Sequence, residues 1–211
     1  MTHPNTEIAA QLHRVSDLLI ERDLSDAART KIQKLAQELV EVMETGAPIS
    51  LAERTERFVK QMSVTSAAAP ISDGDVFPSF LESPYSGSIN ALAPQRITYR
   101  RDGEAVAASV QLGTALEGRP GRAHGGAIAA VFDDAMGAMQ RIIGRNGYTR
   151  SLTTVYHAPF PTDVEVAIRV ICTGVDGPLF TIEATAMTGD RLVASATGTF
   201  VEIDVDRWTT G

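Results

Sequence analysis

The stretch that decides the fold reads HGGAIAAVFDDAMGAMQRII and spans residues 124–143. Its apolar side chains cover most of the circumference of a helix, a pattern typical of a helix that is buried rather than laid on a surface. A glycine pair stands near its start, and Gly144 and Gly147 follow its last apolar residue. Because glycine is favoured just beyond a helix end, the sequence predicts a deeply buried helix over residues 125–143.

Alternating apolar residues on both sides of this helix predict strands. Ahead of it, one strand is expected at 95–100 and another along 106–112, with the hairpin pair Asp102-Gly103 between them. Strands joined by tight turns pair antiparallel, so we expect an α+β protein in which an antiparallel sheet wraps around one helix, the hotdog fold. The strands expected after the helix are 151–157, 164–172, 179–187 and 192–203.

Three parts are expected along the chain: an N-terminal helical extension over 1–65, a linker over 66–94 and the hotdog domain over 95–205. The extension carries apolar residues at helical spacing in three segments, whose packing partner the sequence does not specify. Ser25 is a candidate N-cap for the second segment, and Ser50-Leu51-Ala52-Glu53 has the pattern of a capping box for the third. The linker is rich in small residues and contains Pro70, Pro78, Pro84 and Pro94.

The overall charge and composition exclude some classes of protein. A net charge of −7 without a dense Lys/Arg run argues against nucleic-acid binding. No uncharged apolar run reaches the roughly 18 residues of a membrane span, and no signal-peptide pattern is seen. Cys172 is the only cysteine, which fits a reducing compartment, so a cytoplasmic location is expected. The four histidines lack metal-ligand spacing, so neither a metal nor a cofactor is expected.

The glycine pair after His124 suits a site where negative charge develops. The first N–H groups of a helix have no acceptor within the helix, and the helix dipole adds positive potential there. At Gly125 and Gly126 a ligand can approach the backbone closely, so a carbonyl oxygen that becomes an oxyanion is a natural guest. Arg122 and the arginines near it either contact an anionic group of a ligand or lie solvated on the surface. His124 either takes part in such a site or is a solvated or capping residue.

Asp133 is a carboxylate on a largely apolar helix, which is costly unless the group is paired, hydrated or used. It lies nine residues after His124, roughly 13 Å along a helix that rises about 1.5 Å per residue. One chain can hardly bring both side chains to one carbonyl carbon, whereas a two-fold dimer with neighbouring helices can. The spacing therefore predicts a site shared between subunits, with a structural ion pair as the alternative. Asp134, about 100° further round the helix, is the competing carboxylate.

The same stretch resembles the PaaI-like branch of hotdog acyl-CoA thioesterases, in which His-Gly-Gly is followed by an acidic residue at this offset. Asp133 matches that offset, and Tyr156-His157-Ala158-Pro159 is similar to the family's Tyr-x-x-Pro. The resemblance covers roughly residues 80–203. Gly118 departs from it, because some relatives carry an active-site Asn at that place.

The resemblance implies a role for each matched residue. The N–H of Gly125 would polarise a thioester carbonyl that His124 helps to hold. Asp133 of the partner chain would act as nucleophile or as general base on water. Thr149 would position the water or the carboxylate, unless its hydroxyl is only a turn or capping group.

The function that the resemblance implies is hydrolysis of a fatty or aromatic acyl-CoA to free acid and CoA. The enzyme is expected to be a homodimer or a dimer of dimers with intersubunit active sites. The expected substrate-binding residues are Gly126, Phe132, Met136 and Arg122, although Phe132 and Met136 serve equally well as core. A non-catalytic hotdog module that binds acyl-CoA or lipid is the alternative. A hydratase or dehydratase of the same fold ranks last, because those relatives use an Asp/His pair in a different arrangement and no such pair is seen.

Overall fold

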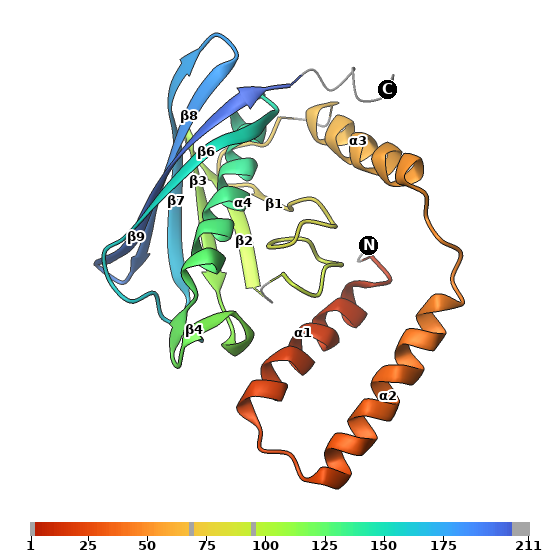
Figure 1. The fold of residues 1–211 in the computed structure, drawn as a ribbon. Helices are drawn as coiled ribbons and strands as arrows, with labels where there is room; N and C mark the ends of the chain where they lie inside the picture. Colours follow the sequence, from red (N-terminus) through yellow and green to blue (C-terminus); the bar gives the residue numbers. More distant parts are fainter. Residues whose placement is uncertain (1–2, 68–69, 94–95, 204–211) are drawn as a thin grey trace.

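A computed structural model describes residues 3–67, 70–93 and 96–203, and its main feature is a curved antiparallel sheet (Figure 1). The strand order in this seven-stranded sheet is β1-β2-β3-β7-β8-β9-β6. Every neighbouring pair is antiparallel, as the tight turns between strands predict. The strands are β1 Val76–Phe77, β2 Arg96–Asp102, β3 Ala105–Gln111, β6 Gly147–Tyr156, β7 Val166–Asp176, β8 Leu179–Thr188 and β9 Arg191–Glu202.

The central helix α4, Gly125–Ile143, lies against the concave face of this sheet (Figure 1). Its bounds are those predicted, because His124 caps its first turn and Gly144 ends it in the left-handed conformation with φ 67°. Phe132 and Met136 are fully buried between the helix and the sheet, and each such side chain contributes about 1.5–3 kcal/mol through apolar burial. The predicted arrangement of a sheet around one buried helix is confirmed.

Close contact between α4 and the sheet depends on a glycine in β9. A Cβ atom added to Gly198 would lie 2.7 Å from Met136 Sδ and 2.8 Å from a ring carbon of Phe200. Only a residue without a side chain therefore lets the helix pack this closely at that point. Gly147, predicted as a helix terminator, is instead the first residue of β6, so this strand begins there rather than at 151.

The segment predicted as a linker, 66–94, is built into the domain over its described part. Val76 and Phe77 form β1 at the edge of the sheet, where the Phe77 ring stacks on Tyr99 with 6.1 Å between centroids. Arg141 of α4 lies over the same Phe77 ring, 5.0 Å from its centroid. These contacts were missed because two residues are too few to show strand periodicity. Pro94 lies outside the described residues.

The N-terminal helices are α1 Thr6–Glu21, α2 Asp26–Glu44 and α3 Leu51–Ala67. Both predicted caps form: Ser25 Oγ accepts from the N–H of Ala28, and Ser50 and Glu53 accept from each other's N–H. Helix α2 is set apart from the sheet, and none of its residues is buried (Figure 1). Within the described residues, no helix is both long enough and apolar enough to cross a membrane.

Helix α1 is attached to the hotdog domain through polar groups. It packs against a short 3-10 helix, Thr114–Leu116, where Asp17 Oδ1 accepts from the N–H of Ala115 at 2.8 Å. His13 Nδ1 donates to the carbonyl of Ala91 at 3.1 Å. A Cβ atom on Gly113 would lie 2.7 Å from Asp17 Oδ1, so a glycine there leaves room for the carboxylate.

Candidate active site

His124 is the N-cap of α4. Its backbone is extended, with φ −66° and ψ 137°, and its Nδ1 accepts from the N–H of Gly126 at 3.0 Å. In the neutral ring this bond leaves the proton on Nε2, which makes Nε2 a donor. The capping role considered for this histidine is therefore observed, and it leaves Nε2 available on a side chain that is not fully buried.

Gly125 begins the helix beside Tyr156, which stands in β6. The Tyr156 hydroxyl donates to the carbonyl of Gly125 at 2.8 Å. A Cβ atom at Gly125 would lie 3.2 Å from that hydroxyl oxygen, tighter than ordinary packing allows. The bond fixes the orientation of the first peptide group of α4. The first N–H groups of a helix have no acceptor inside the helix, so this orientation decides where they point.

A cavity of about 340 Å³ opens at this end of α4. His124 and Gly125 line it together with Arg119 and Arg122, which come from a small hairpin of β4 Glu117–Arg119 and β5 Arg122–Ala123. Two guanidinium groups beside a helix N-terminus form a site suited to an anionic group such as a phosphate. Arg122 lines this cavity with a side chain that is exposed to solvent.

The loop of this hairpin is held by one carboxylate oxygen. Glu117 Oε1 accepts from the N–H of Gly121 at 2.8 Å and from the buried Thr162 hydroxyl at 2.6 Å. Gly118 lies directly against His124, since a Cβ atom there would come within 3.1 Å of the histidine Cα. An asparagine at this place, as in some PaaI-like thioesterases, would require His124 to shift.

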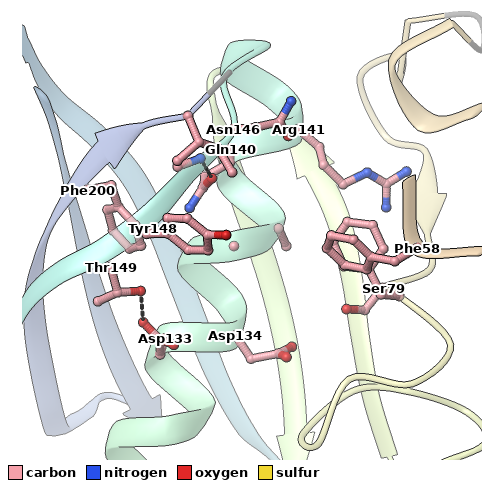
Figure 2. Close-up of a pocket in the computed structure, with 15 residues that line it drawn as sticks. Phe58, Ser79, Asp133, Asp134, Gln140, Arg141, Asn146, Tyr148, Thr149 and Phe200 are labelled. Carbon is pink, nitrogen blue, oxygen red and sulfur yellow. Dashed lines mark hydrogen bonds between the residues drawn. The ribbon is translucent and has the colours of Figure 1, made fainter. Parts of the chain in front are cut away.

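Asp133 lies halfway along α4 and faces β6. Thr149 donates a hydrogen bond from Oγ1 to Asp133 Oδ1 at 2.7 Å (Figure 2). A second cavity of about 250 Å³ contains this pair, with Tyr148 and Gly137 among its lining residues. The ladder between β6 and β9 is irregular between Thr149 and Ser151, which sets the local direction of the strand at the threonine. The structure thus brings the predicted carboxylate and hydroxyl together.

Asp134 has a different role from its neighbour. It accepts hydrogen bonds from the hydroxyls of Ser83 and Tyr99, one on each carboxylate oxygen. Burial of the Tyr99 phenol, together with the charge of Asp134, raises the pKa of Tyr99 well above its ordinary value of 10.0. Figure 2 shows Asp133 and Asp134 pointing to different sides of α4. Both oxygens of Asp134 are thus occupied in a structural network, which favours Asp133 as the reactive carboxylate.

The two halves of the predicted site are separate in one chain. The cavity with His124 and the cavity with Asp133 share no lining residue. Strand β6 connects them, because Tyr156 lines the first cavity and Thr149 lines the second. A single chain therefore does not bring His124 and Asp133 to one reacting atom.

Three of the four predicted substrate contacts line neither cavity. Gly126 is one of them, and its N–H is bonded to His124 Nδ1. Phe132 and Met136 have no exposed surface and pack in the core, and neither lines the cavity of His124 or that of Asp133. Phe132 and Met136 thus belong to the core, which is the alternative that the sequence left open for these two residues. Within the described parts of the chain, no group of three or more His, Cys, Asp or Glu side chains is placed to hold a metal ion.

Two residues of the candidate site were not among the predicted site residues. Tyr156 was visible as part of the Tyr-x-x-Pro pattern, but the sequence could not show that its hydroxyl reaches Gly125. Arg119 was one of several arginines near the glycine pair, and only the β4–β5 hairpin places it beside Arg122. The position of Tyr156 depends on how distant segments pack, whereas that of Arg119 depends on a short hairpin that the sequence pattern did not show.

Comparison with known proteins agrees with this architecture. A solved structure of protein RHA08564, a thioesterase superfamily protein, aligns with a TM-score of 0.73 and 24% identity over 94% of this chain and 95% of its own. A hypothetical thioesterase from Streptococcus pneumoniae TIGR4, solved with coenzyme A, aligns over 52% of this chain and 88% of its own, with a TM-score of 0.49 and 18% identity. A mutant of the phenylacetic acid degradation protein PaaI from Thermus thermophilus covers 47% of this chain and 86% of its own, with a TM-score of 0.44 and 21% identity.

The fold is therefore that of the hotdog proteins, as predicted. Residues 120–195 match the model of the family described as the thioesterase superfamily. This segment includes the His-Gly-Gly sequence, Asp133 and Thr149. The family resemblance inferred from those residues is confirmed.

Proposed function

We propose that the protein is an acyl-CoA thioesterase that hydrolyses the thioester of a fatty or aromatic acyl-CoA. The observation that carries the proposal is the Asp133–Thr149 pair, held at 2.7 Å in a cavity beside a helix whose N-terminus is lined with cationic groups. The match of residues 120–195 to the thioesterase superfamily supports the same chemistry. The lone Cys172 supports a location in a reducing compartment, for which we propose the cytoplasm.

In this proposal each half of the site has a separate task. The cavity at the N-terminus of α4 holds the thioester carbonyl on the N–H of Gly125, with His124 beside it, and Arg119 and Arg122 hold the phosphates of CoA. Asp133 either removes a proton from the attacking water or attacks the carbonyl carbon to form an anhydride that water then cleaves. In both routes the C–S bond breaks, the CoA thiolate takes up a proton, and the free acid leaves.

A homodimer that pairs through β6 would join the two halves. Strand β6 ends the strand order of the sheet, so one of its edges has no neighbour within the described chain. Val155 and Tyr156 of this strand are 47% and 51% exposed, and a long exposed edge strand is a natural surface for pairing.

A two-fold axis near the middle of β6 would bring the Tyr156 end of one strand to the Thr149 end of the other. Asp133 of one protomer would then face His124 and Gly125 of its partner. A dimer of such dimers is compatible with the same geometry.

The test is thiol release from a panel of acyl-CoA substrates, from acetyl to palmitoyl and including aromatic acyl groups. We expect turnover by the wild-type protein and a loss of about a thousandfold in Asp133→Asn, the range seen when a reacting group is removed. Asp190→Asn, at the exposed β8–β9 turn, is the matched control and should keep full turnover.

Two results would overturn the proposal. Unchanged turnover in Asp133→Asn would remove Asp133 from the chemistry. No wild-type turnover with any member of the panel, accompanied by tight acyl-CoA binding, would instead indicate a non-catalytic acyl-CoA- or lipid-binding module.

A further inference from the structure

The N-terminal extension and the hotdog domain together line a third cavity, which has a volume of about 710 Å³ and is partly open to solvent. One wall comes from the extension and includes Ile49, in the connection between α2 and α3. The opposite wall comes from the segment before β2 and includes Phe80, Leu81 and Ile89. The surface between these walls is thus largely apolar, with a volume inside the range of about 300–1,000 Å³ that small-molecule sites occupy.

This cavity adjoins the cavity of Asp133. Ser79, Phe80 and Arg141 line both, so the two spaces meet across the segment that follows β1. In Figure 2, Ser79 and Arg141 stand on the side of α4 towards which Asp134 points. A ligand group that leaves the Asp133 cavity on this side enters the space that the extension lines.

The boundary between the two cavities has fixed side chains. Arg141 donates to the carbonyl of Pro78 and lies over the Phe77 ring, so its guanidinium is held as part of the wall. The rings of Phe58 in α3 and Phe80 pack 5.2 Å apart, which attaches the extension to the wall at the junction. The charged residues Arg57, Lys60 and Glu82 also line the larger cavity, and all three are exposed to solvent. The apolar residues thus provide the inner surface.

The relative volumes indicate what this space is for. The Asp133 cavity, at about 250 Å³, is below the usual range for a ligand site and is suited to the reacting centre alone. The adjoining space is the larger by far and is apolar, which suits a hydrocarbon chain. A solved structure aligns over 94% of this chain, a share that includes most residues of the helical extension.

We propose that the N-terminal extension forms the acyl-chain chamber of the enzyme, and that it selects long or bulky apolar acyl groups over short ones. This inference rests on the proposed thioesterase function. It assigns a substrate-selecting role to Ile49 and to the α2–α3 connection, residues that lie outside the hotdog domain.

The test compares butyryl-CoA with palmitoyl-CoA for wild type and Ile49→Trp, a substitution that places a larger side chain at a position 47% exposed on the chamber wall. Leu51→Trp is the control, because Leu51 is 77% exposed and is not part of the wall. We expect kcat/KM for palmitoyl-CoA to fall about tenfold or more in Ile49→Trp, with butyryl-CoA unchanged and the control like wild type for both. An equal fall for both substrates, or no fall for either, would overturn the proposal.

Binding separates this inference from the proposed function. If the wild type hydrolyses no acyl-CoA, the affinity for palmitoyl-CoA is measured in the same three proteins. A loss of about tenfold in affinity confined to Ile49→Trp would support the chamber even though the thioesterase assignment had failed. Equal affinities in the three proteins would overturn the chamber.

Discussion

Thr149 and Asp133 show how one hydrogen bond can set the direction of a carboxylate. The hydroxyl donates to Oδ1, which leaves Oδ2 for a water or for the carbonyl carbon. In Thr149→Val the shape is kept but the donor is lost, so Asp133 becomes free to rotate. We expect kcat to fall by about tenfold to a hundredfold with KM little changed, measured by thiol release. Thr149→Ser keeps the hydroxyl donor and should retain most of the wild-type kcat. Equal losses of kcat in Thr149→Val and Thr149→Ser would show that side-chain packing, and not the hydrogen bond, positions Asp133.

Asp134 is expected to stabilise the fold through its hydrogen bond with Tyr99. In Asp134→Ala the buried Tyr99 hydroxyl loses its acceptor, and leaving a buried polar group unpaired costs about 1–3 kcal/mol. Urea denaturation should therefore show a lower free energy of unfolding by that amount. Asp190→Ala is the exposed comparison, and its free energy of unfolding should change by no more than about 0.5 kcal/mol. Equal stability of the two variants would contradict the structural role of Asp134.

At the scale of elements, most helix and strand positions of the hotdog domain could be predicted from the hydrophobic pattern of the sequence. The bounds of α4 follow from its apolar surface and from Gly144, since both act locally. The positions of β7, β8 and β9 follow from alternation and turn residues for the same reason. The edge strand β1 could not be predicted, because its contacts with Tyr99 and Arg141 come from segments distant in sequence.

The attachment of α1 gives a prediction about this helix as a unit. Asp17 caps the short helix at Thr114–Leu116, and Asp17→Ala removes that acceptor. We expect the α1–α2 connection at 22–25 to be cleaved faster by protease and α1 amides to exchange faster with solvent. The protection of β7, β8 and β9 should stay unchanged, because α1 lies outside their core. Equal exchange of α1 in variant and wild type would contradict this account of its attachment.

At the scale of the whole molecule, the sequence could identify the parts of the site but not their assembly. The offset between His124 and Asp133 already argued that one chain cannot use both at one atom. The structure adds that the two residues lie in separate cavities along the same exposed edge strand. The cavity lined by the extension could not be predicted, because α1 and α3 contact the domain through isolated polar and aromatic side chains that leave no periodic signal.

The measurement that tests the central claim most directly is subunit complementation between Asp133→Asn and His124→Ala, each inactive alone. After unfolding and refolding together, a mixed dimer would contain one site with both residues intact if sites are shared between subunits. Random pairing should then restore about a quarter of the wild-type thioester hydrolysis, while either variant refolded alone stays inactive. If the mixture forms mixed dimers but hydrolyses no faster than the separate variants, the active site is not built from Asp133 of one subunit and His124 of the other.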